Sequence, residues 1–368
     1  MFKHFIEGIL NRQTLSARLQ ALAAAVLFGA SAPLSKLLLG EVEPIPLAAL
    51  LYLGSGLGAG ILFLVQRSLF KGRSQETHLT RADRPWLLGA ILAGGVAAPI
   101  LLLWGLAQTP ASTASLLLNF EGVATALIAA LVFKEAVGRR ILWAMGLITL
   151  ASILLSWTGG AWGISVGALG VLGACILWGL DNNFTRNICA NNPLVIVGIK
   201  GLGAGLFSGV LALLLGKPFP GWQVSLLAMA VGSVSYGVSI QLFILAMRGL
   251  GAARTSMLFG MAPFVGTFLS VVFLREVPQA LFWVAVPVML GGAWLMLTEN
   301  HTHDHLHESV EHAHPHSHPD EHHTHPRSPE VPLASGTHTH PHHHERLVHT
   351  HVHTPDLHHW HKHRAATE

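Results

Sequence analysis

Ten stretches of about twenty mostly apolar residues fill this chain from Leu19 to Leu297. A helix needs about that length to cross the hydrocarbon core of a bilayer. Charged residues, Gly or Pro separate each stretch from the next, so each stretch is predicted to be one transmembrane helix. The predicted spans are Leu19–Leu39, Ile45–Val65, Trp86–Gln108, Ala111–Phe133, Ile141–Trp157, Gly163–Phe184, Pro193–Leu215, Trp222–Met247, Thr255–Leu274 and Gln279–Leu297.

The composition agrees with an all-α integral membrane protein in a lipid bilayer. Only 11% of the 368 residues are charged and 51% are hydrophobic, whereas about a quarter of the residues in a soluble domain are charged. The formal charge of +3 comes mostly from Lys and Arg in short connections, so no nucleic acid partner is expected. Cys175 and Cys189 belong to one apolar segment and its end, so no disulfide framework is indicated.

Lys and Arg concentrate in alternate connections, and cytoplasmic loops are enriched in these residues. The sequence therefore predicts a multi-pass protein of the cell membrane (inner or plasma membrane) with both termini in the cytoplasm. The first span is expected to be a retained signal anchor, because no cleavage pattern precedes it. The second half follows the charge rule more weakly, since Lys217 and Arg275 fall on the outer side. The inner cations of the first half are Lys3, Arg12, Arg18, Arg67, Lys71, Arg73, Arg81, Arg84, Lys134, Arg139 and Arg140.

The two halves of the apolar region contain three matching motifs in the same order. Each pair falls on spans that are five apart, and five crossings reverse the direction of the chain. The spans are therefore predicted to form two inverted five-helix repeats, an architecture of many secondary transporters. The matches are FGASAPLSK (Phe28–Lys36) with WGLDNNFTR (Trp178–Arg186), GLGAG at Gly56–Gly60 and Gly201–Gly205, and FKE (Phe133–Glu135) with LRE (Leu274–Glu276).

These motifs divide the chain into four parts. The predicted division is a cytoplasmic N-terminal segment at 1–18, a first repeat at 19–158, a second repeat at 163–298, and a disordered, His-rich cytoplasmic tail at 299–368.

The motif order resembles the ten-helix, EamA-type members of the drug/metabolite transporter superfamily. The resemblance is carried by the aromatic-Gly starts of both halves and by the segments Gly105–Glu135 and Arg248–Glu276. It implies export or exchange of small metabolites through a central cavity between the halves, and it does not select one solute. EamA-like second helices often carry an arginine where this chain has Tyr52, whereas Lys200 occupies a comparable place in the second half.

Glu121 stands near the middle of an otherwise apolar span. A charge at that depth costs about 2.5–3.5 kcal/mol on insertion scales, so such residues usually face a cavity or a partner. A carboxylate in a low-dielectric cavity can bind and release a proton near neutral pH, as a proton-coupled carrier requires. We therefore predict a coupling role for Glu121. A protonated carboxyl bonded to a neighbouring helix, or a structural pair with Lys200, remains open.

Further polar residues complete the predicted substrate and coupling site. Asp181 and Asn182 open the polar run DNN near a predicted cytoplasmic end, either at the mouth of a cavity or at the interfacial end of the span. Asn119 is a candidate on another helix face, because it lies two residues before Glu121. Other polar or aromatic residues are expected at membrane interfaces, namely Lys36, Arg186, Trp104 and Trp178.

Histidine dominates the tail, which holds 23 of the 25 histidines of the chain. Imidazole suits zinc, copper and nickel, so we expect the tail to bind a divalent metal such as Zn²⁺ or Ni²⁺. A pH-responsive extension without bound metal is the alternative. The expected ligands are His301, His303, His305, His307, His312, His314, His316, His318, His322, His323 and His325.

No nucleophile paired with a base, phosphate loop or metal-site helix motif is found, so the chain is not expected to be an enzyme or to require a cofactor. The sequence instead predicts a secondary transporter of small organic metabolites or drug-like solutes, with a metal-binding buffer or regulator in its tail. The alternative is a zinc, nickel or cobalt transporter fed by the tail. The ten predicted spans contain no histidine and no carboxylate cluster, which disfavours that alternative. A membrane-anchored metal store and a homodimer remain open.

Overall fold

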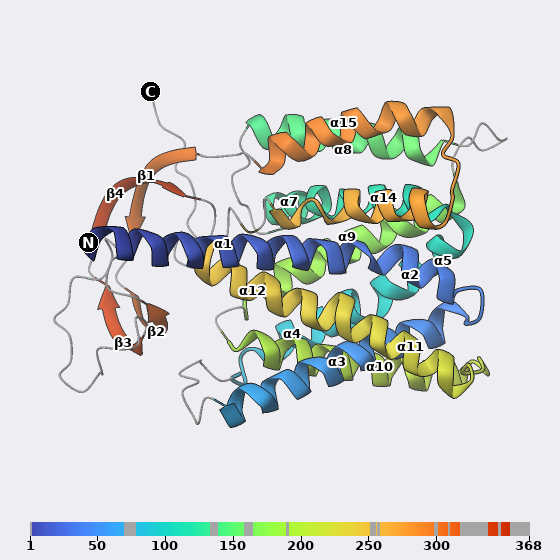
Figure 1. Cartoon of the computed structure of the whole chain (residues 1–368), viewed down its shortest axis with the longest axis horizontal. Coiled ribbons are helices and arrows are strands. Elements are labelled where there is room, and N and C mark those ends of the chain that lie inside the picture. The colour runs from blue at the N-terminus through green and yellow to red at the C-terminus, as the bar shows by residue number, and fades with distance from the viewer. Residues whose placement is uncertain are drawn as a thin grey trace.

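The helices of the chain form one bundle in the structure, which is a computed structural model (Figure 1). The start of the first helix and the four strands of the tail lie at the same end of this bundle. Only the backbone is described for the strands and for the first turns of the first helix. The structure describes residues 2–69, 79–132, 139–157, 165–188, 191–250, 255, 258–297, 301–307, 310–316, 338–344 and 347–353.

Helices of the first half follow the five predicted spans. Two of these spans are helical runs with internal breaks, and one run contains a π-helical segment, η1. The elements are α1 (Phe2–Gly29), α2 (Ser31–Leu38), α3 (Pro44–Leu69), α4 (Arg84–Ala90), η1 (Ile91–Ala97), α5 (Ala98–Gln108), α6 (Ala111–Leu117), α7 (Phe120–Leu131) and α8 (Arg139–Ser156).

The second half repeats this pattern, with a π-helical segment, η2, at the corresponding place in its third span. The elements are α9 (Val166–Arg186), α10 (Pro193–Leu214), α11 (Trp222–Gly232), η2 (Ser233–Val238), α12 (Ser239–Leu250), α14 (Ala262–Phe273) and α15 (Ala280–Leu297).

Seven helical runs in the described residues are long and apolar enough to cross a membrane, and α14 and α15 are shorter apolar helices. The remaining predicted span corresponds to α9, which carries the polar residues Asp181, Asn182 and Asn183. Every predicted span therefore coincides with a helix or a helical run. The prediction of a ten-helix, all-α membrane fold is confirmed.

Packing between the halves follows an approximate twofold relation. Equivalent spans pack on one another, as α3 does on α10, α8 on α15 and α6 on α14. The remaining contacts come in reciprocal pairs, because α5 packs on α9 while α1 packs on α12. The two π segments, at Ile91–Ala97 and Ser233–Val238, are also equivalent in this relation. The bundle is thus built from two inverted repeats.

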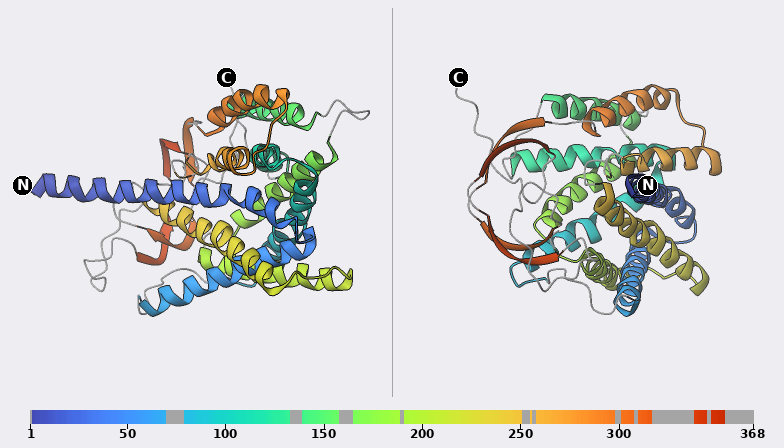
Figure 2. Two further views of the ribbon diagram at one scale, coloured as in Figure 1. Left: turned by 45° about the vertical axis from the view of Figure 1, so that its right-hand side comes forward. Right: turned by 60° about the vertical axis from the view of Figure 1, so that its left-hand side comes forward.

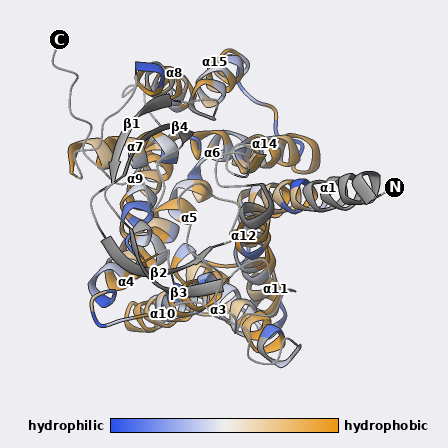
Figure 3. Ribbon diagram, turned by 90° about the vertical axis from the view of Figure 1, so that its left-hand side faces the viewer, coloured by the Kyte–Doolittle hydropathy of each residue, from blue (hydrophilic) through white to orange (hydrophobic). Residues whose placement is uncertain are grey.

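Large apolar side chains cover much of the bundle surface. Examples are Leu131, Trp143, Leu214 and Phe273, which are 76%, 73%, 78% and 73% exposed. Hydrophobic residues are widespread on the outward faces of the helices in the end-on view of Figure 3. A soluble protein rarely exposes so much contiguous apolar surface, so these faces are suited to lipid.

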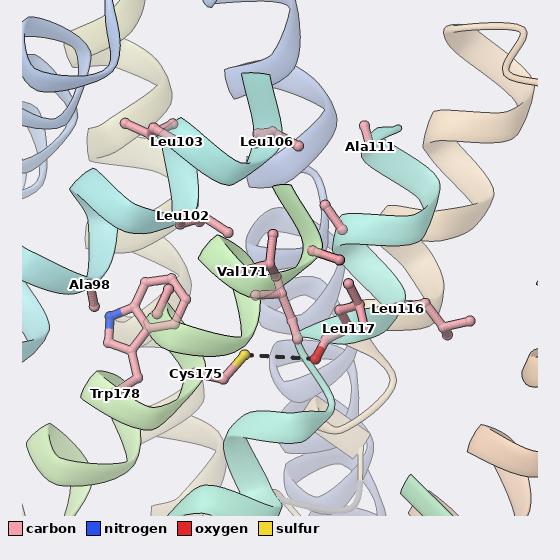
Figure 4. Packing of buried hydrophobic residues seen from close by; sticks show 14 of the residues in the cluster. Ala98, Leu102, Leu103, Leu106, Ala111, Leu116, Leu117, Val171, Cys175 and Trp178 are labelled. Carbon is pink, nitrogen blue, oxygen red and sulfur yellow. Dashed lines mark hydrogen bonds between the residues drawn. The ribbon is translucent and has the colours of Figure 1, made fainter. Parts of the chain in front are cut away.

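One part of the buried core lies between α5, α6 and α9. Val171, Cys175 and Trp178 of α9 lie against Leu102 of α5 and Leu117 of α6 (Figure 4). The Cys175 thiol donates to the Leu117 carbonyl, with 3.7 Å between sulfur and oxygen. This core fixes the position of α9, which carries several of the polar residues described below.

The repeated GLGAG motifs meet where α3 crosses α10. A Cβ atom on Gly201 would lie 2.6 Å from the Gly56 backbone nitrogen, and one on Gly56 would lie 2.5 Å from that of Leu202. Real Cβ atoms do not approach backbone that closely, so the crossing requires glycine on both helices. Of the matches found in the sequence, Phe133–Glu135 lies outside the described residues.

Gly201→Ala is expected to separate α3 from α10 and to destabilise the protein by about 1–3 kcal/mol, as overpacking does. Gly198, one turn away on α10, is also buried but has no neighbour within 4 Å of an added Cβ. Gly198→Ala is therefore expected to leave stability unchanged or to raise it by up to about 1 kcal/mol, because alanine favours helix. Thermal unfolding in detergent measures the stability of both variants. An equal loss of stability in Gly201→Ala and Gly198→Ala would contradict a close backbone contact at Gly201.

The tail forms four strands, β1 (His301–His307), β2 (Val310–His316), β3 (His338–His344) and β4 (Leu347–His353). β1 pairs with β4 and β2 pairs with β3, both antiparallel. The two pairs are separate curved ribbons in Figure 2. This differs from the predicted disordered tail. A period-two alternation of His with Thr, Val or Leu suits a strand, and pairing satisfies the backbone without a hydrophobic core.

Candidate functional site

Two opposite charges lie together inside the bundle. Lys200 on α10 donates through Nζ to Oδ2 of Asp181 on α9. Thr185 Oγ1 donates to the other carboxylate oxygen of Asp181 over 3.0 Å. Asp181 is only 4% exposed, so its carboxylate is buried within the bundle. A charge this buried needs partners for both of its oxygens, and here it has them.

The π segment η1 brings its backbone against this ion pair. The Gly94 carbonyl accepts hydrogen bonds from Tyr52 Oη at 2.8 Å and from Trp178 Nε1 at 3.0 Å. A Cβ atom at Gly94 would overlap the Asp181 carboxylate, so the approach of α9 requires glycine here. π turns inside α-helices are frequent at functional sites. Trp178 is 8% exposed, so its predicted place at a membrane interface is wrong.

Glu121 lies where the fourth span is broken. α6 ends at Leu117 and α7 begins at Phe120, so Glu121 occupies the first turn of α7. The partial positive charge at a helix N-terminus favours a carboxylate in that turn. Its Oε1 also accepts a hydrogen bond from Asn182 Nδ2 at 2.8 Å. The carboxylate that is isolated in the sequence thus has both a helix end and a polar partner on α9.

The DNN run of α9 joins these groups into one network. Asn182 Nδ2 donates to Thr125 Oγ1 at 3.1 Å, and Asn183 Nδ2 donates to the Thr125 carbonyl at 3.2 Å. Glu121 interacts electrostatically with both members of the ion pair. The structure therefore brings together four of the predicted site residues, with Asp181 rather than Glu121 as the partner of the lysine. These four are Glu121, Asp181, Asn182 and Lys200.

Asn119, the fifth predicted site residue, makes a different contact. It stands at the break between α6 and α7, where its Nδ2 donates to the Leu116 carbonyl at 3.0 Å. The same carbonyl also accepts from the Asn119 backbone nitrogen at 3.2 Å, so the side chain and the backbone of Asn119 both close this turn. Asn119 thus stabilises the turn that places Glu121 at the start of α7.

A chain of aromatic rings runs from this network across the two repeats. Tyr52 stacks on Tyr236 with 5.9 Å between ring centroids, and Phe28 meets Tyr236 edge-on at 5.8 Å. Phe259 then lies 5.2 Å from Phe28 and 4.8 Å from Phe243. All of these rings except that of Tyr52 are partly exposed. Together they form the aromatic chain, which leads away from the ion pair toward α1, α12 and α14.

Sequence reasoning missed several members of the site. Tyr52, Thr125 and Gly94 were not candidates. Thr125 and Gly94 are common residue types in an apolar span, and Tyr52 was noted only because EamA-like helices often carry an arginine there. One signal could have pointed to them, since Tyr52 and Tyr236 are the only tyrosines of the chain and both fall inside predicted spans.

A second polar contact lies within the first repeat, at the opposite end of the bundle from the strands. Lys36 Nζ donates to the carbonyls of Leu106, Ala107 and Thr109 at the end of α5. The cation thus satisfies the free carbonyls of a helix C-terminus, where positive charge is favoured. That Lys36 snorkels to the membrane interface stays a prediction. The side chain of its repeat partner, Arg186, lies outside the described residues.

Glu276 binds the other end of the connection between α5 and α6. Its Oε1 and Oε2 accept from the backbone nitrogens of Ala111 and Ser112 at 2.6 and 2.8 Å, at the start of α6. Arg275, which precedes it, has a φ of 53° and turns the chain toward α6. Because α6 belongs to the first repeat and Glu276 to the second, this carboxylate joins the two repeats.

Metal-binding groups are not clustered among the side chains that the structure describes. No three His, Cys, Asp or Glu residues in that set lie where they could hold a metal ion. Of the predicted metal ligands, His301, His303, His305, His307, His312, His314 and His316 lie on β1 and β2, whereas His318, His322, His323 and His325 lie outside the described residues.

Comparisons with known proteins agree with this arrangement. An uncharacterized transporter of Methanothermobacter thermautotrophicus is 28% identical over 308 residues, which cover 79% of this chain and 88% of that protein. A crystal structure described only as that of a protein superposes with a TM-score of 0.55 and 21% identity, over 76% of this chain and 95% of that one. This second likeness supports the fold alone.

The two repeats also match a family description directly. Residues 15–157 and 165–298 each match the model of the EamA-like transporter family. These matches span both halves of the helix bundle, including the polar network and the aromatic chain. The protein is therefore a multi-pass membrane protein that belongs to the EamA-like transporter family.

Proposed function

We propose that the protein is a secondary transporter that exports or exchanges small organic metabolites or drug-like solutes. The observation that carries this proposal is the buried polar network of Glu121, Asp181 and Lys200, which lies where the repeats meet. In transporters built from inverted repeats, the substrate and coupling sites lie near the middle of the membrane at the repeat interface, often beside broken helices. The break before Glu121 and the π segment η1 both fit that rule.

The groups of the site suit a solute with a polar end and a planar or apolar portion. Asn182 is exposed and adjoins Glu121, so it can donate to or accept from a solute. The partly exposed rings of the aromatic chain offer faces on which a planar group can stack. A polar solute would contact the network while its apolar portion contacts the rings of α1 and α12.

Glu121 is the group we propose for proton coupling. Both oxygens of Asp181 are already occupied, and Lys200 neutralises it. Glu121 has an uncharged partner, Asn182, so its proton can be gained or lost without breaking an ion pair. Binding of solute and of proton at one carboxylate would make them compete, which is the requirement for exchange of one against the other.

Glu121→Gln is expected to uncouple transport from the proton gradient while preserving solute exchange. Glutamine keeps a hydrogen bond to Asn182 and cannot ionise. In vesicles, exchange of one proton for one neutral solute can hold a concentration ratio of about tenfold per pH unit, since one unit corresponds to about 1.4 kcal/mol. The unmodified protein is expected to approach that concentration ratio. The Glu121→Gln variant is expected to reach equal solute concentrations on the two sides, which is a ratio near one. Glu43→Gln, at an exposed carboxylate, is the matched control. A gradient held by Glu121→Gln would remove Glu121 from the coupling mechanism.

With both termini in the cytoplasm, the connection between α5 and α6 lies on the outer side of the membrane. We propose that the contacts of Lys36 and Glu276 close this side. Glu276 joins the second repeat to α6 of the first, so moving the repeats apart at this end requires its two hydrogen bonds to break. The outward-facing state would then lack these bonds.

The tail is proposed to bind Zn²⁺ or Ni²⁺ and to buffer or sense the metal beside the transporter.

The second candidate function, transport of the divalent metal itself, is favoured only by the position of the His-rich strands at one end of the bundle (Figure 1). In the part of the chain that the structure describes, the hydrogen-bond partners of Lys200 and Asp181 include no histidine or thiolate, the ligands that zinc and nickel prefer. We therefore propose organic solutes as the cargo and the metal as a ligand of the tail.

A further inference from the structure

Backbone pairing places histidines of distant parts of the tail directly opposite one another. In the ribbon of β1 and β4, His301, His303 and His305 pair with His353, His351 and His349. In the ribbon of β2 and β3, His312, His314 and His316 pair with His342, His340 and His338. Each ribbon therefore has three consecutive alternate rungs that consist of histidine alone, which we call histidine rungs.

The three histidine rungs of a ribbon share one face. Residues directly opposite in an antiparallel pair lie on the same face, and residues two apart along a strand do so as well. The rungs between them have other compositions, namely Thr302 with Val352 and Asp304 with Thr350 in the ribbon of β1 and β4. Each ribbon thus has six histidine positions on one face, in a two-by-three array.

The spacing of this array suits chelation of a metal. Opposite Cβ atoms in an antiparallel pair are about 5 Å apart, and positions two apart along a strand are separated by about 7 Å. One rung can supply two imidazoles to an ion, and two neighbouring rungs can supply the four ligands of tetrahedral zinc. In the ribbon of β1 and β4, a shift of the pairing by one residue would place His301, His303 and His305 opposite Val or Thr, so the register matters.

We propose that the histidine rungs are the metal sites of the tail, for a borderline divalent cation such as Zn²⁺ or Ni²⁺. Each site is built jointly by an early strand, β1 or β2, and a late strand, β4 or β3. The inference rests on the proposal that the tail binds metal, and it goes beyond that proposal by naming the ligand pairs. Composition alone suggested the histidines up to His325, whereas the register adds six from His338 to His353. Metal would then hold each ribbon closed, because the ligands come from both of its strands.

Zinc titration of the full-length protein in detergent, in competition with a chromophoric chelator, tests the pairing. One variant carries His301, His303 and His305→Gln, a second carries His349, His351 and His353→Gln, and a third carries all six changes. The two strands of one ribbon share the same sites, so each variant is expected to lose the same number of zinc ions, at most one for each of the three rungs. The variant with all six changes is expected to lose no more zinc than either of the variants with three changes.

The matched control carries His358, His359 and His361→Gln, which removes as many imidazoles at positions that belong neither to the histidine rungs nor to the ligands predicted from the sequence. It is expected to retain the zinc of both ribbons. Hydrogen exchange provides a second measurement, since zinc should protect the amides of β4 in the unmodified protein but not after the changes in β1.

The paired sites would be overturned if the six-fold variant lost as much zinc as the two three-fold variants together, or if the control lost as much zinc as either of them. Either result would leave a metal-binding tail intact. No zinc bound by the full chain would overturn both the paired sites and the proposed role of the tail.

Discussion

Lys200→Met is expected to abolish solute transport and to destabilise the folded protein by about 3–5 kcal/mol, because it leaves a buried carboxylate without its cation. Methionine keeps an unbranched apolar side chain, so the loss of charge is the main change. Asp181 is 4% exposed and cannot recover its hydration where it lies. Efflux from reconstituted vesicles measures the first effect, and thermal unfolding in detergent measures the second.

Removing both charges separates stability from function. The double variant Lys200→Met with Asp181→Asn leaves no unpaired charge, so it is expected to recover most of the stability but none of the transport. Lys217→Met is the control, because Lys217 pairs with Glu43 at 2.8 Å between side chains that are 40% and 47% exposed. Such a surface pair contributes about 0–1 kcal/mol. Recovery of transport in the double variant would show that the buried pair serves only the fold.

Glu276→Ala is expected to open the outer side of the protein. The carboxylate accepts two backbone hydrogen bonds at the start of α6, and a hydrogen bond to a charged group contributes about 1.5–3 kcal/mol. Loss of even one such contribution would shift the balance between closed and open states by roughly tenfold to a hundredfold. The rate at which a membrane-impermeant maleimide labels Thr109→Cys, in a chain whose two cysteines are alanine, reports this change.

Thr109 suits this assay because it is 3% exposed and its carbonyl is held by Lys36. Labelling from outside is expected to be slow in the parent chain. In the chain that also carries Glu276→Ala, the labelling rate is expected to rise by about the same factor as the shift toward the open state. Glu43→Ala, near the same end of the bundle, should leave the rate unchanged because its ion pair is exposed. Slow labelling in Glu276→Ala would mean that this contact does not close the outer side.

The spans and their inverted repeat could be predicted because their signal lies in single stretches of sequence. Apolar length identifies a transmembrane helix without reference to its neighbours. The same holds for the GLGAG motifs, whose small residues predict close packing, and Gly56 and Gly201 do meet. Glu121, Asp181 and Lys200 were also found from sequence, since a charge within an apolar span is conspicuous.

The partners of these charges could not be predicted, because they depend on distances across the bundle. Lys200 was considered as a partner for Glu121, but the packing of α9 on η1 places it against Asp181 instead. The π segment has no signature in the letters ILAGGVA, yet it supplies the Gly94 carbonyl to Tyr52 and Trp178. In the tail, composition indicated metal ligands, but only the register of the strands shows which histidines are opposite one another.

The nature of the cargo is tested most directly by parallel flux measurements on the full-length protein in proteoliposomes. The vesicles would hold a mixture of amino acids, amines, nucleosides and aromatic dyes under a proton gradient, with efflux followed by mass spectrometry and zinc flux followed in the same preparation. The account predicts that at least one organic solute leaves through the unmodified protein but not through Lys200→Met, and that zinc flux equals that of protein-free vesicles. Zinc flux that requires Lys200, without efflux of any organic solute, would contradict it.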